Sequence, residues 1–363
     1  MRTKTYLMLI SAAGAILSPL SAGALEPVSM PGTPVPQRFV IGTKEGSPLD
    51  HLPRGVRLAT AFGERAVISP DGRKFVFVDH FLGNAFEYDI ASRTTRSVTA
   101  HTPHLGISRI HYLSDGSYLI VAPRELGASP RETRRTKLEL FWLDAQASGP
   151  LQPLGQPVFE GVATSRISNR IAWTENTPRD VYPLSPDAQG TATLKVGEVV
   201  VENGRARLAG ARTLMSRQFN ECVLEAQDFL PGDAAVVLPC YNNDGSLVGH
   251  KVLSVALADG RVTDYPVPAD QYGEVEGVFP DGKRAFVECG NKHTEGLDLC
   301  LLELVPRNPR YTRITFAQDF GNYRFSNPTV SPDGKLVAFQ FGYASDESGT
   351  GRGILLMDFP PAP

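Results

Sequence analysis

The sequence predicts an all-β fold, a six-bladed β-propeller with four-stranded antiparallel blades and a ring closed by an N-terminal strand. Two observations predict it. After residue 37, short apolar runs rich in Val, Ile, Phe and Tyr alternate with Gly, Pro, Asp and Asn, with no amphipathic helical pattern of three turns. One phrase also recurs, as "AVISPDGRKFVFV" from Ala66, "GVFPDGKRAFVEC" from Gly277 and "TVSPDGKLVAFQF" from Thr329.

The first residues have the pattern of a secretory signal peptide. Arg2 and Lys4 precede an apolar run from Tyr6 to Leu17, and residues 21–24 supply an Ala-x-Ala cleavage signal. The apolar run is shorter than the roughly 20 residues that a membrane-spanning helix needs. We therefore expect residues 1–24 to be removed and the product to be periplasmic or secreted, although a membrane anchor is the alternative.

The rest of the chain divides into a short lead-in and one large domain. Residues 25–37 contain four prolines and little charge, which favours an extended lead-in, and residues 38–363 form a single β-propeller domain. Removal of residues 1–24 leaves 34 basic and 39 acidic side chains, a net charge of −5. This balance argues against nucleic-acid binding, and we expect a monomer with no membrane span and no cofactor.

Each recurring phrase predicts a β-hairpin. Pro presets φ, Asp bonds its own backbone and Gly accepts a positive φ, so Pro-Asp-Gly between two apolar runs forms a tight turn. Looser copies begin at Ile110, Thr164 and Ala226. The six turns lie 44 to 63 residues apart, near Gly72, Gly116, Asn169, Gly232, Gly282 and Gly334. A period of this size in an all-β chain indicates propeller blades.

Further apolar runs supply the outer strands of each blade. Third strands are expected from Ala85, Leu138, Leu194, His250, Leu297 and Gly353, and fourth strands from Thr94, Ala211, Arg261 and Tyr311. The last blade leaves no room for its own fourth strand, so a segment from Arg38 or from Val56 is expected to pair there and remove the exposed edge. A two-sheet sandwich is the alternative fold.

The recurring turn resembles the WD40-like (PD40) repeat of TolB-like propellers. The resemblance rests on Ser69–Arg73, on Ser331–Lys335 and on the phrase "GEVEGVFPDGK" at 273–283, and it implies the fold rather than a function. TolB itself carries an additional α/β domain before its propeller, which is not expected here, and this departure argues against a Tol-Pal role. Propellers of this type also cap serine hydrolases, but the sequence lacks a Gly-x-Ser-x-Gly motif.

The four cysteines are predicted to form two disulfides. Counting outward from the predicted turns sets Cys222 opposite Cys240 and Cys289 opposite Cys300, and an exported protein favours disulfides. Buried free thiols are the alternative. A zinc site is disfavoured because the pairs fall on different blades.

Ligand binding is expected at the end of the ring opposite the Pro-Asp-Gly turns, where the loops between strands two and three and between blades emerge. These loops are polar and of mixed charge. The candidate ligand-binding residues are His80, Asn84, His101, His104, Glu175, Asn220, Glu221, Asp244, Tyr272, Glu274, His293, Tyr323 and Arg324. No catalytic residue is singled out.

Two features of this end suggest more specific chemistry. The stretch "HTPHLGISRIH" from His101, together with His80, raises the question of a transition metal, but the spacing matches no defined motif. Residues 123–137 carry five basic side chains in a predicted mobile loop that could hold an anionic partner or simply be solvated.

These observations favour an exported, non-enzymatic propeller that binds a protein or peptide partner, or a glycan, through its loop-rich end. The alternative is a metal-dependent lyase that acts on carbohydrate and uses histidines at the channel mouth.

Overall fold

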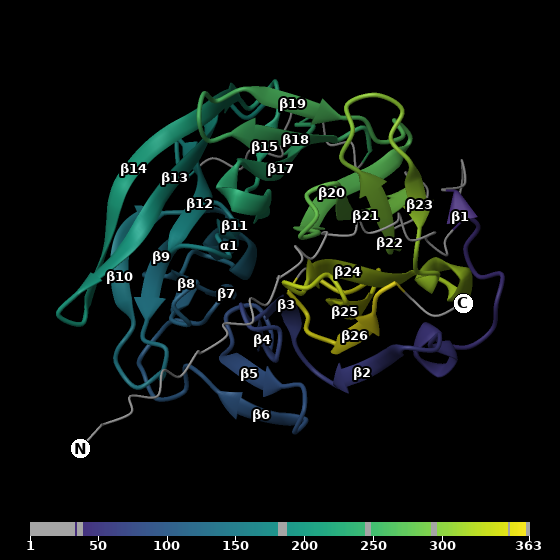
Figure 1. Ribbon diagram of the computed structural model, residues 1–363, viewed down its shortest axis with the longest axis horizontal. Helices are drawn as coiled ribbons and strands as arrows, with labels where there is room; N and C mark the ends of the chain where they lie inside the picture. The colour runs from purple at the N-terminus through teal and green to yellow at the C-terminus, as the bar shows by residue number, and fades with distance from the viewer. Residues whose placement is uncertain are drawn as a thin grey trace, which may run out of the picture. The chain divides into compact units, whose positions relative to one another are not determined.

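A computed structural model describes residues 33–34, 39–180, 187–243, 248–291, 296–347 and 349–360, all within one compact unit, Pro31–Pro363. Within these residues the strands form six antiparallel sheets around a common axis (Figure 1). The six-bladed propeller is therefore confirmed and the sandwich alternative is wrong. Residues 1–24 and most of the lead-in lie outside the described residues, so the signal peptide stays a prediction.

The first three blades are given from the axis outward. Blade 1 consists of β3 (Glu64–Ile68), β4 (Lys74–Val78), β5 (Ala85–Asp89) and β6 (Thr94–Ser97). Blade 2 consists of β7 (Arg109–Tyr112), β8 (Tyr118–Pro123), β9 (Leu138–Leu143) and β10 (Gln152–Pro157). Blade 3 consists of β11 (Val162–Thr164), β12 (Arg170–Thr177), β13 (Thr191–Glu202) and β14 (Arg205–Gln218).

Of the other three blades, blades 4 and 5 carry one additional strand each, and blade 6 has four strands. Blade 4 consists of β15 (Val223–Leu224) and β16 (Asp228–Phe229), both paired with β17 (Ala235–Tyr241), then β18 (Lys251–Ala256) and β19 (Val262–Tyr265). Blade 5 consists of β20 (Gln271–Val278), β21 (Arg284–Asn291), β22 (Asp298–Glu303), β23 (Tyr311–Arg313) and β1 (Thr33–Pro34). Blade 6 consists of β24 (Tyr323–Val330), β25 (Leu336–Tyr343), β26 (Ile354–Asp358) and β2 (Val56–Thr60).

The hairpin turns have the chemistry that the repeated phrase predicts. In blade 1 the Ser69 hydroxyl donates to Asp71 at 2.6 Å, and the same carboxylate accepts from the backbone N–H of Arg73 at 3.0 Å. In blade 6 the Asp333 carboxylate accepts in the same way, from the Ser331 hydroxyl at 2.6 Å and from the N–H of Lys335 at 3.0 Å. The shared Ser-Pro-Asp-Gly sequence therefore forms the same hydrogen-bonded turn near both ends of the chain.

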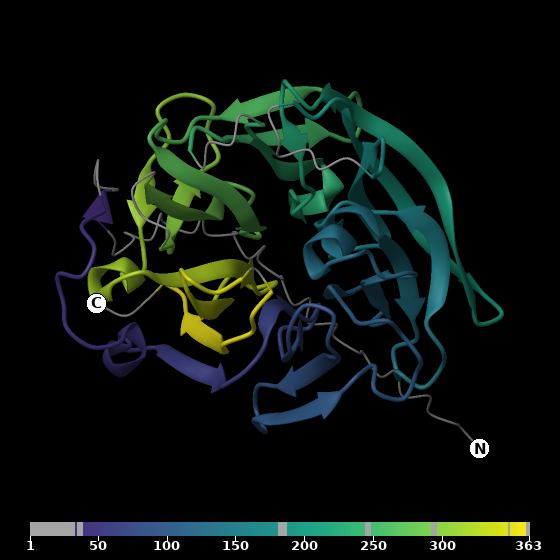
Figure 2. The ribbon, with the colours of Figure 1, turned by 180° about the vertical axis from the view of Figure 1, so that it is seen from behind.

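The ring closes through one of the two predicted N-terminal segments. Strand β2 pairs with β26, with Val56 opposite Met357 and Leu58 opposite Leu355. Both views show the purple strand β2 beside the yellow strand β26 (Figure 1, Figure 2). Closure from Val56 is confirmed, whereas Arg38 lies outside the described residues and its neighbour Phe39 instead packs against the Cys289–Cys300 disulfide.

The outer strands agree with the prediction except in blade 2. Strand β10 was not predicted, because its sequence Gln-Pro-Leu-Gly-Gln-Pro contains residues that are depleted in strands. Proline is tolerated there because β10 is an edge strand that needs only one row of hydrogen bonds. In blade 3 the long hairpin of β13 and β14 explains the long interval between the third and fourth turns.

The basic segment 123–137 is not the loop that the sequence suggested. It contains the helix α1 (Pro130–Thr136), and the Ser129 side chain caps it by accepting from the N–H of Glu132. The Glu132 carboxylate accepts in return from the N–H of Ala128 at 2.7 Å. Such a Ser-x-x-Glu pair with Pro in the first turn is a helix-start signal that the analysis of the sequence missed.

The remaining helical elements are single turns. They are the 3-10 helices η1 (Pro48–His51), η2 (Pro231–Asp233) and η3 (Ala317–Phe320). None of the helices in the described ranges is long and apolar enough to cross a membrane.

Apolar side chains fill the space between neighbouring sheets. Val76 and Val78 of blade 1 pack with Ile110 and Ile120 of blade 2, and Val237 and Val252 of blade 4 belong to one cluster with Val287 of blade 5. Burial of both faces explains why the inner strands read as nearly continuous apolar runs.

Both predicted disulfides are present. Cys222 bonds Cys240 and Cys289 bonds Cys300, with Cα–Cα distances of 5.3 and 5.8 Å. The strand register differs from the prediction by two residues. Cys240 lies opposite Leu224 and Cys300 lies opposite Val287, so each pair is a diagonal rather than a directly opposed pair.

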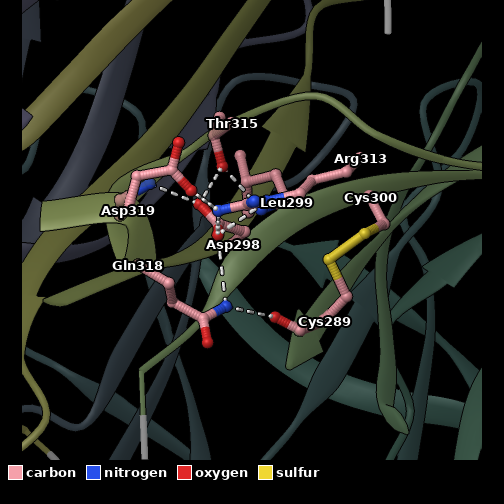
Figure 3. The surroundings of a disulfide bond; sticks show 9 residues. Cys289, Asp298, Leu299, Cys300, Arg313, Thr315, Gln318 and Asp319 are labelled. Atoms are coloured by element: carbon pink, nitrogen blue, oxygen red, sulfur yellow. Dashed lines mark hydrogen bonds and ion pairs between the residues drawn. A yellow bond between two sulfur atoms is a disulfide. The ribbon is translucent and has the colours of Figure 1, made fainter. Parts of the chain in front are cut away.

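Beside the second disulfide, a fully buried carboxylate joins β22 to the segment that follows β23. Asp298 accepts from the Arg313 guanidinium at 2.6 and 3.0 Å, from the Thr315 hydroxyl at 3.0 Å, and from the Gln318 amide at 3.1 Å (Figure 3). The N–H of Ala317 donates to the same carboxylate at 2.6 Å. Burial raises the pKa of Asp298, and Arg313 opposes that effect. This network fixes the edge of blade 5.

Candidate functional site

A cavity of about 440 Å³ lies at the end of the ring opposite the Pro-Asp-Gly turns. Side chains of all six blades line it, and most of them are charged or polar. The lining residues include Arg65, Arg109, Arg134, Arg135, Glu160, Glu225, Tyr241, Tyr272, Glu274, Glu288, Arg324, Gln340, Gly342 and Tyr343.

A smaller cavity of about 90 Å³ continues along the axis toward the turns. Arg65, Arg109 and Asn327 line both cavities and therefore lie at the boundary between them. Arg166 of blade 3 crosses the far end, donating to the Asp228 carboxylate at 3.2 Å and to the carbonyl oxygens of Val278 and Val330 at 3.0 and 3.4 Å. This one guanidinium ties blade 3 to blades 4, 5 and 6 below the cavities.

One side of the larger cavity is rich in guanidinium groups. Arg109 contacts the Glu225 carboxylate at 2.6 Å, and both side chains are buried. Arg134 contacts Glu160 at 2.6 Å, and Arg135 pairs with the same carboxylate. Burial opposes the ionisation of Glu160, but the neighbouring guanidiniums of Arg134 and Arg135 lower its pKa to about 2.

The opposite side is rich in carboxyl groups. Glu274 and Glu288 line the larger cavity and Glu276 lines the smaller one, and the three offer oxygens that all lie within 4.8 Å of one another. Burial and the neighbouring Glu274 raise the pKa of Glu288 to about 8 and raise that of Glu276 well above its usual value. Crowded, buried carboxyl groups hold protons near neutral pH, so this side is less negative than its composition suggests.

Hydroxyl and amide groups hold the carboxyl groups in place. Tyr241 donates to Glu274 at 2.6 Å, and Tyr272 donates to the same carboxylate. The Asn327 amide donates to Glu276 at 3.0 Å, and its backbone N–H donates to Glu288 at 2.7 Å. Three ionised carboxyl groups at this spacing are able to coordinate an oxygen-seeking divalent cation.

Two inner strands bulge at equivalent points and direct a side chain to the axis. The register of β3 shifts between Glu64 and Val67, and that of β24 shifts between Ser326 and Thr329. Within these bulges Arg65 has φ +56° and Asn327 has φ +47°. Asn adopts this left-handed conformation readily, whereas a long side chain such as Arg adopts it only at a cost.

Three of the predicted ligand-binding residues line the larger cavity: Tyr272, Glu274 and Arg324. Two others, Asp244 and His293, lie outside the described residues. The remaining eight are not among the lining residues.

Those eight make local contacts on separate blades. Glu175 pairs with Lys195 within blade 3, and the Glu221 carboxylate accepts from the N–H of Gln218 at 3.0 Å. Asn220 is an exposed neighbour of Glu221. Tyr323 stacks on Phe341 with ring centroids 5.8 Å apart. These contacts are typical of residues that hold loops and strands in place.

The structure does not bring the histidines together as a metal site. His104 contacts Asn84 at 3.2 Å and accepts from the N–H of Gly106 at 3.0 Å, so both of its ring nitrogens are engaged. His101 contacts the carbonyl oxygen of Gly149 at 2.8 Å, and His80 lies 3.1 Å from Asp79. Among the described residues, the one group of candidate metal ligands is the glutamate group, which contains no histidine.

The inner-strand residues of the cavity were not predicted from the sequence, because the candidate residues were all taken from predicted loops. A positional signal exists, however. The residue seven positions before the turn glycine is charged or polar in four blades, where it is Arg65, Arg109, Glu225 and Asn327. All four line the axial cavities. A polar residue at that point of an apolar strand therefore marks the channel.

The comparisons with known proteins find neighbours among solved structures alone. No family model matches the chain, and no curated protein is significantly similar to it in sequence. Among solved structures, oligogalacturonate lyase from Vibrio parahaemolyticus is 12% identical with a TM-score of 0.49, over 84% of this chain and 93% of that one. TolB from Acinetobacter baumannii is 11% identical with a TM-score of 0.47, over 82% of this chain and 64% of that one. Hydrazine synthase from Kuenenia stuttgartiensis is 12% identical with a TM-score of 0.49, over 81% and 82%.

Proposed function

We propose that this chain is an exported, non-enzymatic β-propeller that binds a segment of a peptide or protein partner in the cavity at its loop-rich end. The observation that carries the proposal is the cavity of about 440 Å³ to which all six blades contribute side chains. Its volume lies within the range of ligand-binding sites, and it converges on the axis where the inner strands meet.

The lining residues give the cavity an exposed rim and a buried floor. Arg131, Tyr343 and Glu347 line it and are exposed, whereas Arg109 and Glu225 line it and are buried. Since Arg166 crosses the axis at the far end, a ligand would enter from the loops.

The chemistry of the lining suits a polar chain. Guanidinium groups, carboxyl groups and the phenol groups of Tyr241 and Tyr272 supply donors and acceptors in a confined space, and Phe159 adds an apolar surface. Peptide groups and charged side chains can be matched by such a set, whereas a lipid tail cannot.

The two disulfides support export, because disulfides persist in oxidising compartments. Periplasmic or secreted localisation is part of the proposal. The mass of the mature protein isolated from its native host would test cleavage after residue 24.

The binding proposal is tested by selecting peptides from a random displayed library against the immobilised protein. The blocking variant is Gly342→Trp, because a Cβ at Gly342 would meet only the Asp346 carboxylate at 3.8 Å and the indole would then occupy the cavity. Ile167→Trp is the matched control, since Ile167 is 68% exposed at a turn on the opposite end.

We expect selected peptides to bind the protein and the Ile167→Trp variant alike, and to bind Gly342→Trp at least about tenfold more weakly, which corresponds to about 1.4 kcal/mol. Peptides that bind Gly342→Trp unchanged, or a library that yields no binder, would contradict the proposal.

A further inference from the structure

Arg65 is a buried guanidinium that forms no ion pair with any described residue. Its side chain lines both axial cavities, and the residue is only 6% exposed. Its Nη1 donates to the Ser108 carbonyl oxygen at a long 3.5 Å, and its Nε has no hydrogen-bond partner within the described ranges. Throughout the described part of the chain, no carboxylate approaches it within ion-pair distance. Such a group is costly to bury.

Two neighbouring carboxylates are already engaged by other cations, and the third, buried Glu64, acts on Arg65 electrostatically without forming an ion pair with it in the described part of the chain. Glu160 pairs with both Arg134 and Arg135, and Glu225 pairs with Arg109. Burial and the adjacent Arg134 lower the pKa of Arg65 to about 10, although Glu64 and Glu160 act in the opposite direction. The floor of the cavity therefore carries more positive charge than its partners balance.

The backbone at Arg65 is strained as well. Its φ of +56° lies in the left-handed region, where blade 6 places Asn327 at the equivalent point. The strained backbone and the unpaired buried charge at this position both lower the stability of the unliganded protein. Strain of this kind persists at sites where it serves function.

We propose that Arg65, assisted by Arg109, binds a carboxylate group of the ligand at the floor of the larger cavity. The inference rests on the proposed function only in taking that cavity as the binding site. The Nε atoms of both residues have no hydrogen-bond partner among the residues that the structure describes, so both guanidiniums retain donor capacity. A planar guanidinium matches a carboxylate in geometry.

A singly charged group fits this floor better than a doubly charged phosphate. Glu160, which its guanidinium neighbours keep ionised, lines the same cavity and would repel additional negative charge. The opposite wall of Tyr241, Tyr272 and Glu288 would then contact the rest of the ligand through neutral hydrogen bonds. The carboxylate could come from a peptide C-terminus, an acidic side chain or an acidic sugar.

The test measures the increase in melting temperature of the full mature chain at constant ionic strength with small probes. The peptide arms are N-acetyl-dialanine with a free carboxylate, the same peptide as its C-terminal amide, and N-acetyl-glutamate amide, whose side chain carries the charge. The sugar arm compares glucuronate with glucose. Inorganic sulfate and phosphate are measured as tetrahedral anions.

The variants separate charge from structure. Arg65→Asn removes the cation and installs the residue that blade 6 uses at this point, so it should fold. Arg65→Lys keeps the charge without the planar donor set. Arg73→Asn is the matched control, because Arg73 lies in the turn at the opposite end with its side chain 80% exposed.

We expect carboxylate probes to raise the melting temperature at millimolar concentration and their uncharged counterparts to have no effect. Affinity should fall at least tenfold in Arg65→Asn, less in Arg65→Lys, and not at all in Arg73→Asn. A response to glucuronate alone that depends on Arg65 would support the carboxylate site while contradicting the peptide function.

Several results would overturn the inference. They are an equal response to the acid and amide forms, a response that survives Arg65→Asn, and a response confined to sulfate or phosphate. The absence of any response to all carboxylate probes would overturn it too.

Discussion

Arg313 of blade 5 and Arg65 of blade 1 are buried to the same extent, each 6% exposed, yet their surroundings differ. Arg313 contacts the carboxylates of Asp298 and Asp319 at 2.6 and 2.9 Å, and it packs over the rings of Phe39 and Phe316. Arg65 has neither an ion pair nor a ring contact within the described residues. The first charge is balanced by the fold, and the second is not.

This difference separates structure from binding. A buried charge with all its partners stabilises one arrangement of strands, and the Asp298 network is such a case (Figure 3). A buried charge facing a cavity without a partner lowers stability unless something arrives to balance it. The contrast assigns blade 5 a structural ion pair and blade 1 a binding group.

The largest effect is expected when the structural arginine, Arg313, is replaced. Arg313→Met leaves Asp298 buried without its main cation, and we expect the free energy of unfolding to fall by about 3–5 kcal/mol. Guanidinium-induced unfolding with the disulfides intact measures it.

Arg57→Met is the control for that substitution. Arg57 also pairs with an aspartate, Asp358 at 3.0 Å, but both side chains are largely in solvent. We expect this variant to lose no more than about 1 kcal/mol. Equal losses in the two variants would show that the Arg313 network contributes nothing beyond a surface pair.

A second, intermediate effect concerns the carboxyl groups that face Arg65 across the cavity. If these carboxyl groups were ionised at neutral pH, their negative charge would balance the positive charge of Arg65. The pKa of Glu288 is raised from 4.5 to about 8, so the folded protein holds a proton that the unfolded chain releases, and stability falls as pH rises through this window. One such group contributes up to about 1.4 kcal/mol per pH unit.

Glu288→Gln should therefore flatten the decline of stability between about pH 5 and 8, as measured by unfolding at each pH. Glu276 keeps part of the slope because its pKa is raised as well. Glu202→Gln is the control, since Glu202 pairs with Arg207 on the surface. An unchanged slope in Glu288→Gln would mean that the carboxyl wall is ionised and does balance Arg65.

The sequence was sufficient for the fold because the decisive signals are local. The bonds of Ser69 and Asp71 lie within one turn, and each disulfide joins cysteines fewer than 20 residues apart, with separations of 18 and 11. Such contacts can be counted along the chain. Strand β10 was missed because its sequence contains prolines, which are unusual in strands. Helix α1 was missed because its arginines suggested a mobile loop and its capping residue Ser129 was overlooked.

The cavity could be predicted only in part. Tyr272, Glu274 and Arg324 were identified because they follow loops into the ring, but Arg65 and Glu225 lie within apolar strands and resemble ordinary strand residues. Whether such a residue faces the axis depends on a bulge, and whether its charge is balanced depends on blades far away in sequence. Neither can be read from local periodicity.

The smallest expected change is also the most direct test of the account. The free energy of unfolding of the unliganded protein is measured for Arg65→Asn beside wild type. The substitution removes an unpaired buried charge and replaces an arginine in the left-handed region by an asparagine, which adopts that conformation more readily. We therefore expect the free energy of unfolding to lie within about 1 kcal/mol of the wild-type value or above it. A loss comparable to that of Arg313→Met would contradict the account, because it would mean that the fold itself depends on the Arg65 charge.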